Sequence, residues 1–147
     1  METLLRIVVS LVVALLLLGC TDETLDASYP TASDALADGA VERGWIPAWI
    51  PSTATDIHEV HNLDSNQSAL SFTLPQAAWR PPEFCRRADG GELPEPAFDR
   101  SWLPSSQEMA VAYDFYSCPS DLPGPILETV AVQRGGNRVL HWRVFAR

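Results

Sequence analysis

The chain has 147 residues, of which 46% are hydrophobic, and its 19 acidic and 10 basic side chains give a formal net charge of −9. This length supports one globular domain with a core of its own and is too short for two comfortable domains. Because nucleic acids attract basic surfaces, the acidic balance disfavours nucleic acid as a partner.

An apolar run near the N-terminus indicates an export signal. Residues 7–18 are apolar except for Ser10, and the run is shorter than the roughly 20 residues that a transmembrane helix needs. Its length is typical of a secretory signal peptide, although Glu2 offsets the charge of Arg6. We therefore predict a signal peptide at residues 1–19.

The leader ends in Leu17-Leu18-Gly19-Cys20, which resembles the lipobox of bacterial lipoproteins. This resemblance implies that Cys20 becomes the mature N-terminus and carries a thioether-linked diacylglycerol, with a further acyl chain such as palmitate in a Gram-negative host. Two or more chains give stable anchoring, so the membrane is the first expected partner. The alternative is an ordinary signal peptide with a chance cysteine near its cleavage site.

The expected location is the cell envelope, with the domain in the periplasm of a Gram-negative host. Thr21 follows the anchor residue, and by analogy with enterobacterial sorting the absence of Asp at this position favours the outer membrane over the inner one.

Two further cysteines fit an oxidising compartment. Once Cys20 is lipidated, Cys85 and Cys118 remain as an even pair, which predicts a disulfide between them. Two free buried thiols are the alternative. A zinc site is disfavoured, because neither residue has a second Cys or a His at the close spacing of zinc motifs.

Residues 20–44 are rich in acidic and small polar residues and contain few large apolar ones. Such a composition buries little surface, so we predict an acidic flexible tether with, at most, a short helix near residues 33–41. The composition changes at Trp45, where aromatic residues, isoleucines and prolines begin. We therefore place a single globular domain at residues 45–147.

Alternating apolar residues indicate strands in the second half of the chain. Residues 57–63 and 69–74 are predicted to form a hairpin, and so are residues 126–134 and 138–146 on either side of Gly135-Gly136-Asn137. A further strand is expected at residues 109–116.

The intervening segments contain many prolines. We expect a short helix within residues 76–87 and a long surface loop at residues 88–106. The fold class that follows is α+β: an antiparallel sheet of about five strands, one short helical segment and long proline-rich loops. A single covering helix would leave one face of the sheet partly open to a partner.

The densest polar cluster contains two histidines, His58 and His61. In a strand, residues three apart point to opposite faces, which argues against a shared metal site unless His141 supplies a ligand from a distant strand. We therefore predict no metal, no cofactor and no catalytic residue, with His58, His61 and His141 kept as candidates. No phosphate loop or nucleophile elbow is present in the sequence.

Five tryptophans offer a candidate platform for stacking a sugar or a peptide, with core packing as the commoner role of such residues. They are Trp45, Trp49, Trp79, Trp102 and Trp142.

The run from Trp45 to Pro51, continuing through residues 54–61, resembles a pattern found in small uncharacterised bacterial envelope proteins. This resemblance implies an envelope role and supplies no activity or functional residues.

These features favour a non-enzymatic accessory module that binds another envelope protein. One alternative is an inhibitor or immunity factor against a basic envelope hydrolase, which the acidic balance suggests. The other is a small hydrolase or metal-binding enzyme that uses His58, His61 and His141.

Overall fold

The computed structural model describes residue 1 and residues 23–146. Apart from Met1, the predicted signal peptide lies outside these residues, and so does the predicted lipidation site Cys20. Across residues 23–146, no helix has the length and apolar character needed to span a membrane.

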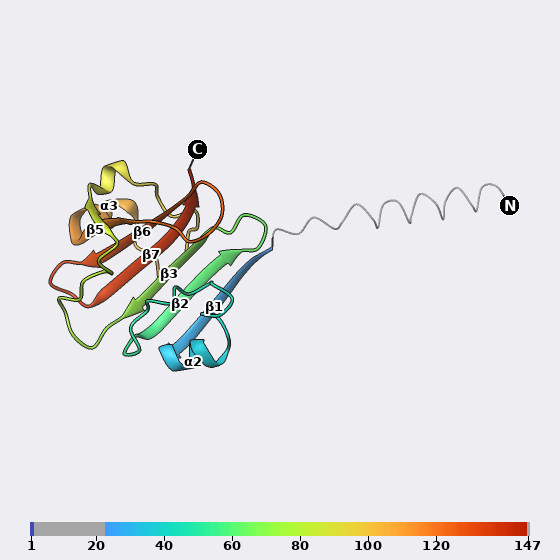
Figure 1. Cartoon of the computed structure of the whole chain (residues 1–147), viewed down its shortest axis with the longest axis horizontal. Helices are drawn as coiled ribbons and strands as arrows, with labels where there is room; N and C mark the ends of the chain where they lie inside the picture. The colour runs from blue at the N-terminus through green and yellow to red at the C-terminus, as the bar shows by residue number, and fades with distance from the viewer. Residues whose placement is uncertain (2–22, 147) are drawn as a thin grey trace.

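Residues 23–146 form one antiparallel sheet of seven strands with two short α-helices and a 3₁₀ turn (Figure 1). The strands lie side by side in the order β1-β2-β3-β7-β6-β5-β4. The strands are β1 (Thr24–Thr31), β2 (Thr55–Asn62), β3 (Ser68–Thr73), β4 (Arg86–Ala88), β5 (Tyr113–Cys118), β6 (Ile126–Gln133) and β7 (Arg138–Phe145). The helices are α2 (Ala32–Ala37), α3 (Ser106–Ala112) and the 3₁₀ turn η1 (Gly90–Glu92).

The predicted fold class, an α+β arrangement on an antiparallel sheet, is confirmed, with more strands than expected. Both predicted hairpins are present: Val60 pairs with Ala69 between β2 and β3, and Ala131 pairs with Leu140 between β6 and β7. The two additional strands, β1 and β4, form the edges of the sheet.

The expectation of a flexible tether at residues 20–44 is wrong from residue 24 onward. Strand β1 pairs with β2 along its whole length, from Thr24 opposite Asn62 to Thr31 opposite Thr55. An edge strand needs backbone partners on one side only, so a segment with few large side chains can still add to a sheet. The folded domain therefore begins at β1, about twenty residues before the predicted boundary at Trp45.

The short helix expected near residues 33–41 is present as α2 but begins and ends earlier. Thr31 caps its N-terminus in a capping box with Asp34. Two alanines of this helix, Ala32 and Ala35, are buried against the sheet.

Two other predictions are wrong, and the local sequence explains why. Residues 76–87 contain no helix, because Pro81-Pro82 removes backbone donors and clashes with a preceding turn. The strand expected at residues 109–116 is divided into α3 and β5. A capping box between Ser105 and Glu108 starts the helix here, and the alternation of apolar residues continues into the strand.

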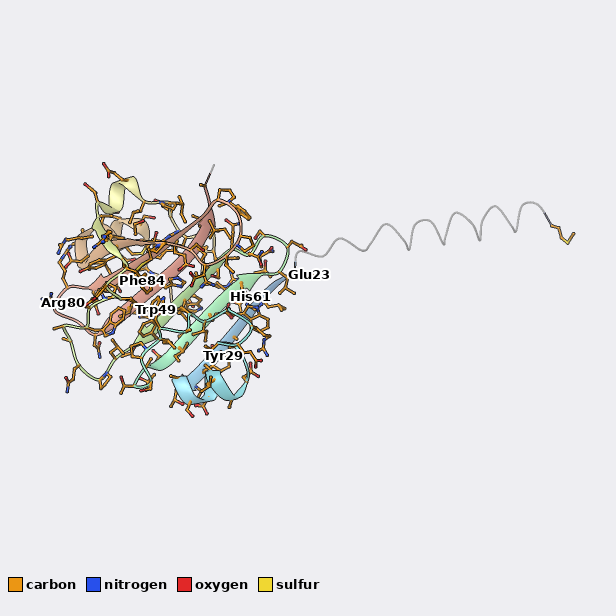
Figure 2. The ribbon with its side chains drawn as sticks, viewed as in Figure 1. Glu23, Tyr29, Trp49, His61, Arg80 and Phe84 are labelled. Atoms are coloured by element: carbon orange, nitrogen blue, oxygen red, sulfur yellow. A yellow bond between two sulfur atoms is a disulfide. The ribbon has the colours of Figure 1, made fainter. Side chains whose placement is uncertain are left out.

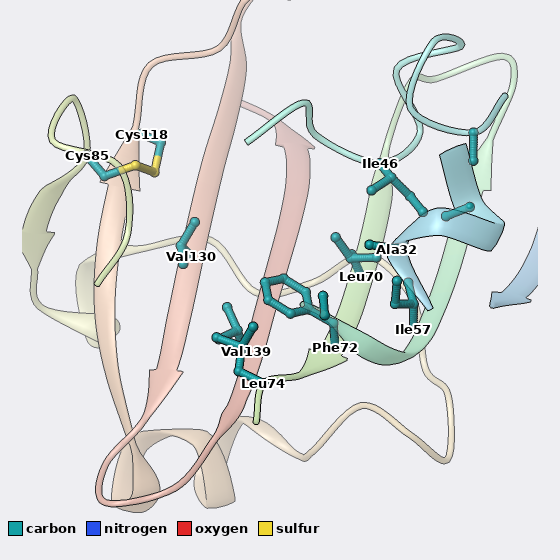
Figure 3. Packing of buried hydrophobic residues seen from close by; sticks show 13 residues of the cluster. Ala32, Ile46, Ile57, Leu70, Phe72, Leu74, Cys85, Cys118, Val130 and Val139 are labelled. Carbon is teal, nitrogen blue, oxygen red and sulfur yellow. A yellow bond between two sulfur atoms is a disulfide. The ribbon is translucent and has the colours of Figure 1, made fainter. Parts of the chain in front are cut away.

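Both faces of the sheet are covered, so the expectation of a partly open face is also wrong. On one face, Leu70 and Phe72 pack beneath Ile46 and the segment that follows α2 (Figure 3). On the other face, Leu140 and Trp142 belong to a second cluster with Met109 of α3.

The predicted disulfide between Cys85 and Cys118 is present, with an S–S distance of 2.07 Å and a Cα–Cα distance of 4.2 Å (Figure 3). It ties the end of the proline-rich segment 75–85 to the end of β5. This segment forms one wall of the groove described below.

Candidate functional site

Two polar features stand out in the described part of the chain: a buried cluster of ionisable side chains within the core, and a groove lined by arginines. The buried cluster lies on the face of the sheet that α2 covers. Its members are Glu59, His61, Ser68, Glu128, His141 and Arg143, all less than 9% exposed.

Two carboxyl groups, those of Glu59 and Glu128, link the side chains of this cluster. His61 Nδ1 lies 2.7 Å from Glu59 Oε1, and the His61 ring stacks on Trp45 at 3.9 Å. Arg143 donates to Glu128 at 2.7 Å, and His141 Nε2 lies 3.3 Å from the same carboxylate. Glu59 Oε2, His61 Nε2, Ser68 Oγ and His141 Nδ1 are buried without a hydrogen-bond partner among the described residues. The contacts that are made link side chains within β2 and between β6 and β7.

The environments of the two glutamates push their pKa values apart. Burial raises the pKa of Glu59 to about 8, with a further rise from the negative charge of Asp26. Burial also acts to raise the pKa of Glu128, but the hydrogen bonds and charges of His141 and Arg143 outweigh it and bring the pKa to about 2. At neutral pH, Glu59 is therefore a neutral hydrogen-bonding acid and Glu128 a carboxylate paired with Arg143.

Burial also lowers the pKa of both histidines in the cluster. His61 and His141 are thus neutral rings at pH 7. Paired carboxyl groups with separated pKa values occur at catalytic sites, but here they are enclosed by the core.

The structure does not bring the three candidate histidines together. His58 lies on the opposite face of β2 from His61, where it contacts Ser28 at 3.1 Å and Asp56 at 3.0 Å and stacks on Trp102 at 5.8 Å. Among the described residues, no group of three or more His, Cys, Asp or Glu side chains is placed to hold a metal ion.

Four of the five tryptophans serve packing. Trp45 stacks on His61, Trp102 stacks on His58, and Trp142 is buried with its indole N–H donating to the carbonyl of Pro94 at 2.8 Å. Trp49 lies between Trp79, 5.9 Å away, and the edge of His141.

The fifth tryptophan, Trp79, lines a groove of about 750 Å³ between the proline-rich segment 75–85 and the face of β5 and β6. This volume lies within the range of ordinary small-ligand sites, roughly 300–1,000 Å³. Its basic lining consists of three arginines. The lining includes Trp79, Arg80, Arg87, Asp114, Tyr116 and Gln133.

The arginines of this groove differ in how many of their N–H donors are used in hydrogen bonds to the protein. Arg134 donates to Asp114 and to the carbonyls of Ala110, Val111 and Tyr113, so it caps the C-terminus of α3. Arg87 makes one contact, with Asp114 at 2.8 Å, and its side chain is 69% exposed.

Arg80 is exposed, and no hydrogen bond or ion pair joins it to any of residues 23–146. Three arginines thus line the groove against two acidic residues, Glu83 and Asp114. The groove is locally basic in a chain whose net charge is −9.

The groove lies far from the point at which the chain enters the domain. Strand β1 and strand β5 are separated by five strand spacings in the sheet order, or about 24 Å at roughly 4.8 Å per spacing. Figure 2 shows Arg80 and Glu23 on opposite sides of the molecule.

Sequence reasoning missed this groove. Arg80 and Arg87 stand in a segment that was expected to be a helix, and Asp114 and Gln133 come from strands far along the chain. The available signal was the clustering of Arg80, Arg86 and Arg87, three of the ten basic residues, in a chain that has no lysine.

Comparison with known families gives one match. Residues 23–73 match the family model of the YbbD head domain, about a third of the chain. The match spans β1, α2, β2 and β3, including Glu59 and His61, and it ends before the groove-lining segment. No curated protein and no solved structure matches the chain significantly.

Proposed function

We propose that the chain is a lipid-anchored envelope protein whose domain acts as a non-enzymatic binding module, with the arginine-lined groove as its binding site. Cys20 would carry the lipid in the cell envelope, with the outer membrane favoured over the inner one. The position of the groove relative to the anchor carries this proposal.

Strand β1 begins at Thr24, four residues after Cys20. Four residues of chain span at most about 14 Å, so a lipid on Cys20 would hold the β1 edge of the sheet near the bilayer. The groove lies about five strand spacings away from that edge. A partner in the periplasm would reach the groove without competing with the membrane.

The groove also favours binding over chemistry. Its charged side chains are three arginines and two acids, its uncharged polar residues include Tyr116 and Gln133, and none of the described residues that line it is a histidine. Guanidinium groups are always charged and offer five fixed donors, which suits recognition of an anionic group.

Membrane fractionation tests the anchor. Wild-type protein should sediment with membranes and remain there in high salt, because acyl chains are not released by screening charges. A variant in which residues 1–20 are replaced by an ordinary cleavable secretory leader without a cysteine should instead appear in the soluble fraction. Wild-type protein found in the soluble fraction would refute the anchor.

Crosslinking in cells tests the binding role of the groove. A photo-reactive residue in place of Ala77, an exposed position on the groove wall, should give a discrete adduct. The same residue in place of Leu36, which is 64% exposed on α2, is the matched control. Equal labelling at both positions, or none at Ala77, would count against the groove as the binding site.

A further inference from the structure

We infer that the groove binds an acidic peptide segment of a partner protein, with Arg80 and Arg87 receiving its carboxylates. This inference rests on the proposed binding role of the groove, although it does not depend on the lipid anchor. It follows from the two guanidinium groups of the groove with the fewest hydrogen bonds to the protein and from the other residues that line the groove.

Arg80 and Arg87 are the two arginines of the groove that retain most of their donors. Arg80 has no partner among the described residues, and Arg87 uses a single contact to Asp114. Arginine pairs with carboxylates through two parallel N–H donors, and such charge-assisted hydrogen bonds are stronger than neutral ones. Two separate guanidinium groups therefore suit a ligand that carries two carboxylates.

The remaining lining suits a peptide. Of its two aromatic residues, Tyr116 and Trp79, Trp79 is held within an aromatic cluster: Trp49 stacks against it at 5.9 Å and 24°, and Phe72 lies 6.1 Å away at 79°. Pro81 and Pro82 supply apolar wall for short side chains, and Gln133 supplies an amide that can pair with a backbone.

The acidity of the rest of the chain does not oppose this ligand. Charges on exposed surfaces are screened beyond about 8 Å at physiological ionic strength, whereas direct contacts between guanidinium and carboxylate are about 3 Å long. The net charge of −9 slows the approach of an acidic segment at low salt without preventing its binding at the groove.

Fluorescence anisotropy with the full-length lipidated protein in detergent tests this inference. The probe is a labelled synthetic peptide with two glutamates separated by one apolar residue, and the control peptide carries glutamines at both positions. We expect saturable binding of the acidic peptide at physiological salt and at least tenfold weaker binding of the glutamine peptide.

Single substitutions identify the residues responsible. Arg80→Gln and Arg87→Gln should each weaken binding about tenfold. Arg86→Gln is the matched control: it removes the same charge from the adjacent residue of β4, but Arg86 does not line the groove. An unchanged near-ultraviolet circular dichroism spectrum would show that each variant is folded.

Four outcomes would overturn the inference. They are equal binding of the two peptides, equal loss of binding in Arg86→Gln and Arg80→Gln, no binding of the acidic peptide by wild-type protein, and tighter binding of an oligogalacturonide than of the acidic peptide. Failure of peptide binding would not bear on the proposed lipid anchor, because membrane fractionation tests the anchor separately. An unmodified Cys20 would refute the anchor and leave the peptide measurements valid.

Discussion

The buried acid Glu59 should make the domain less stable as the pH rises above neutrality. Its side chain is 1% exposed, its Oε1 lies 2.7 Å from His61 Nδ1, and burial raises its pKa from 4.5 to about 8. In addition to His61, three charged neighbours act on it: Asp26 raises the pKa, while Arg143 and Arg43 lower it. At pH 7 the folded protein therefore retains a proton that the unfolded chain has released.

The size of the effect follows from proton linkage. Between pH 4.5 and 8 the folded state binds more protons at Glu59, so its contribution to the free energy of unfolding falls by about 1.4 kcal/mol per pH unit. His61 and His141 have lowered pKa values, so they act in the opposite sense, and they still do so at pH 6.5, where an unfolded histidine is half protonated. From pH 6.5 to 8 Glu59 alone lowers the free energy of unfolding by about 1.7 kcal/mol, the two histidines offset about 0.8 kcal/mol of this, and the net loss is about 1 kcal/mol.

Urea denaturation at several pH values between 6.5 and 8 measures this loss. The Glu59→Gln variant keeps a donor for His61 but has no proton to release, so its free energy of unfolding should not fall over this range and should rise by about 0.8 kcal/mol through the two histidines. Glu42→Gln, a change at an exposed acid, should retain the wild-type slope. The same slope in Glu59→Gln and wild type would refute the reasoning.

Three other perturbations test the core. Reducing the Cys85–Cys118 disulfide, which closes a loop of sequence separation 33, should lower the free energy of unfolding by about 3–4 kcal/mol in a comparison of oxidised and reduced urea transitions. Arg143→Leu leaves Glu128 buried without its guanidinium partner and should cost about 3–5 kcal/mol by the same measurement. Trp142→Ala removes a side chain that is 2% exposed and should cost about 3–5 kcal/mol, or abolish the cooperative thermal transition.

The two central hairpins could be predicted from the sequence because the alternation of apolar residues and the turn residues indicate the same structure. Leu70, Phe72 and Leu74 alternate with polar residues, and Gly135-Gly136 marks the β6–β7 turn. Strand β1 was not readable: it contains Pro30 and few large apolar residues, and its stability comes from pairing with a strand that lies about thirty residues further along the chain.

The candidate site was less accessible to sequence reasoning. A cysteine count and the expected compartment were sufficient for the disulfide. The groove depends on the position of residues 77–85 over β5 and β6, which only the tertiary structure defines. The polar cluster of Glu59 and His61 was visible in the sequence as a dense polar stretch, but its enclosure by Trp45 and Arg143 was not.

The lipid anchor on Cys20 is tested most directly by the intact mass of the full-length protein purified in detergent from its host. We predict the mass of residues 20–147 with one disulfide and an added diacylglycerol, together with a further acyl chain in a Gram-negative host. A mass that retains residues 1–19, or that begins at an unmodified Cys20, would contradict the assignment of this chain to a membrane surface.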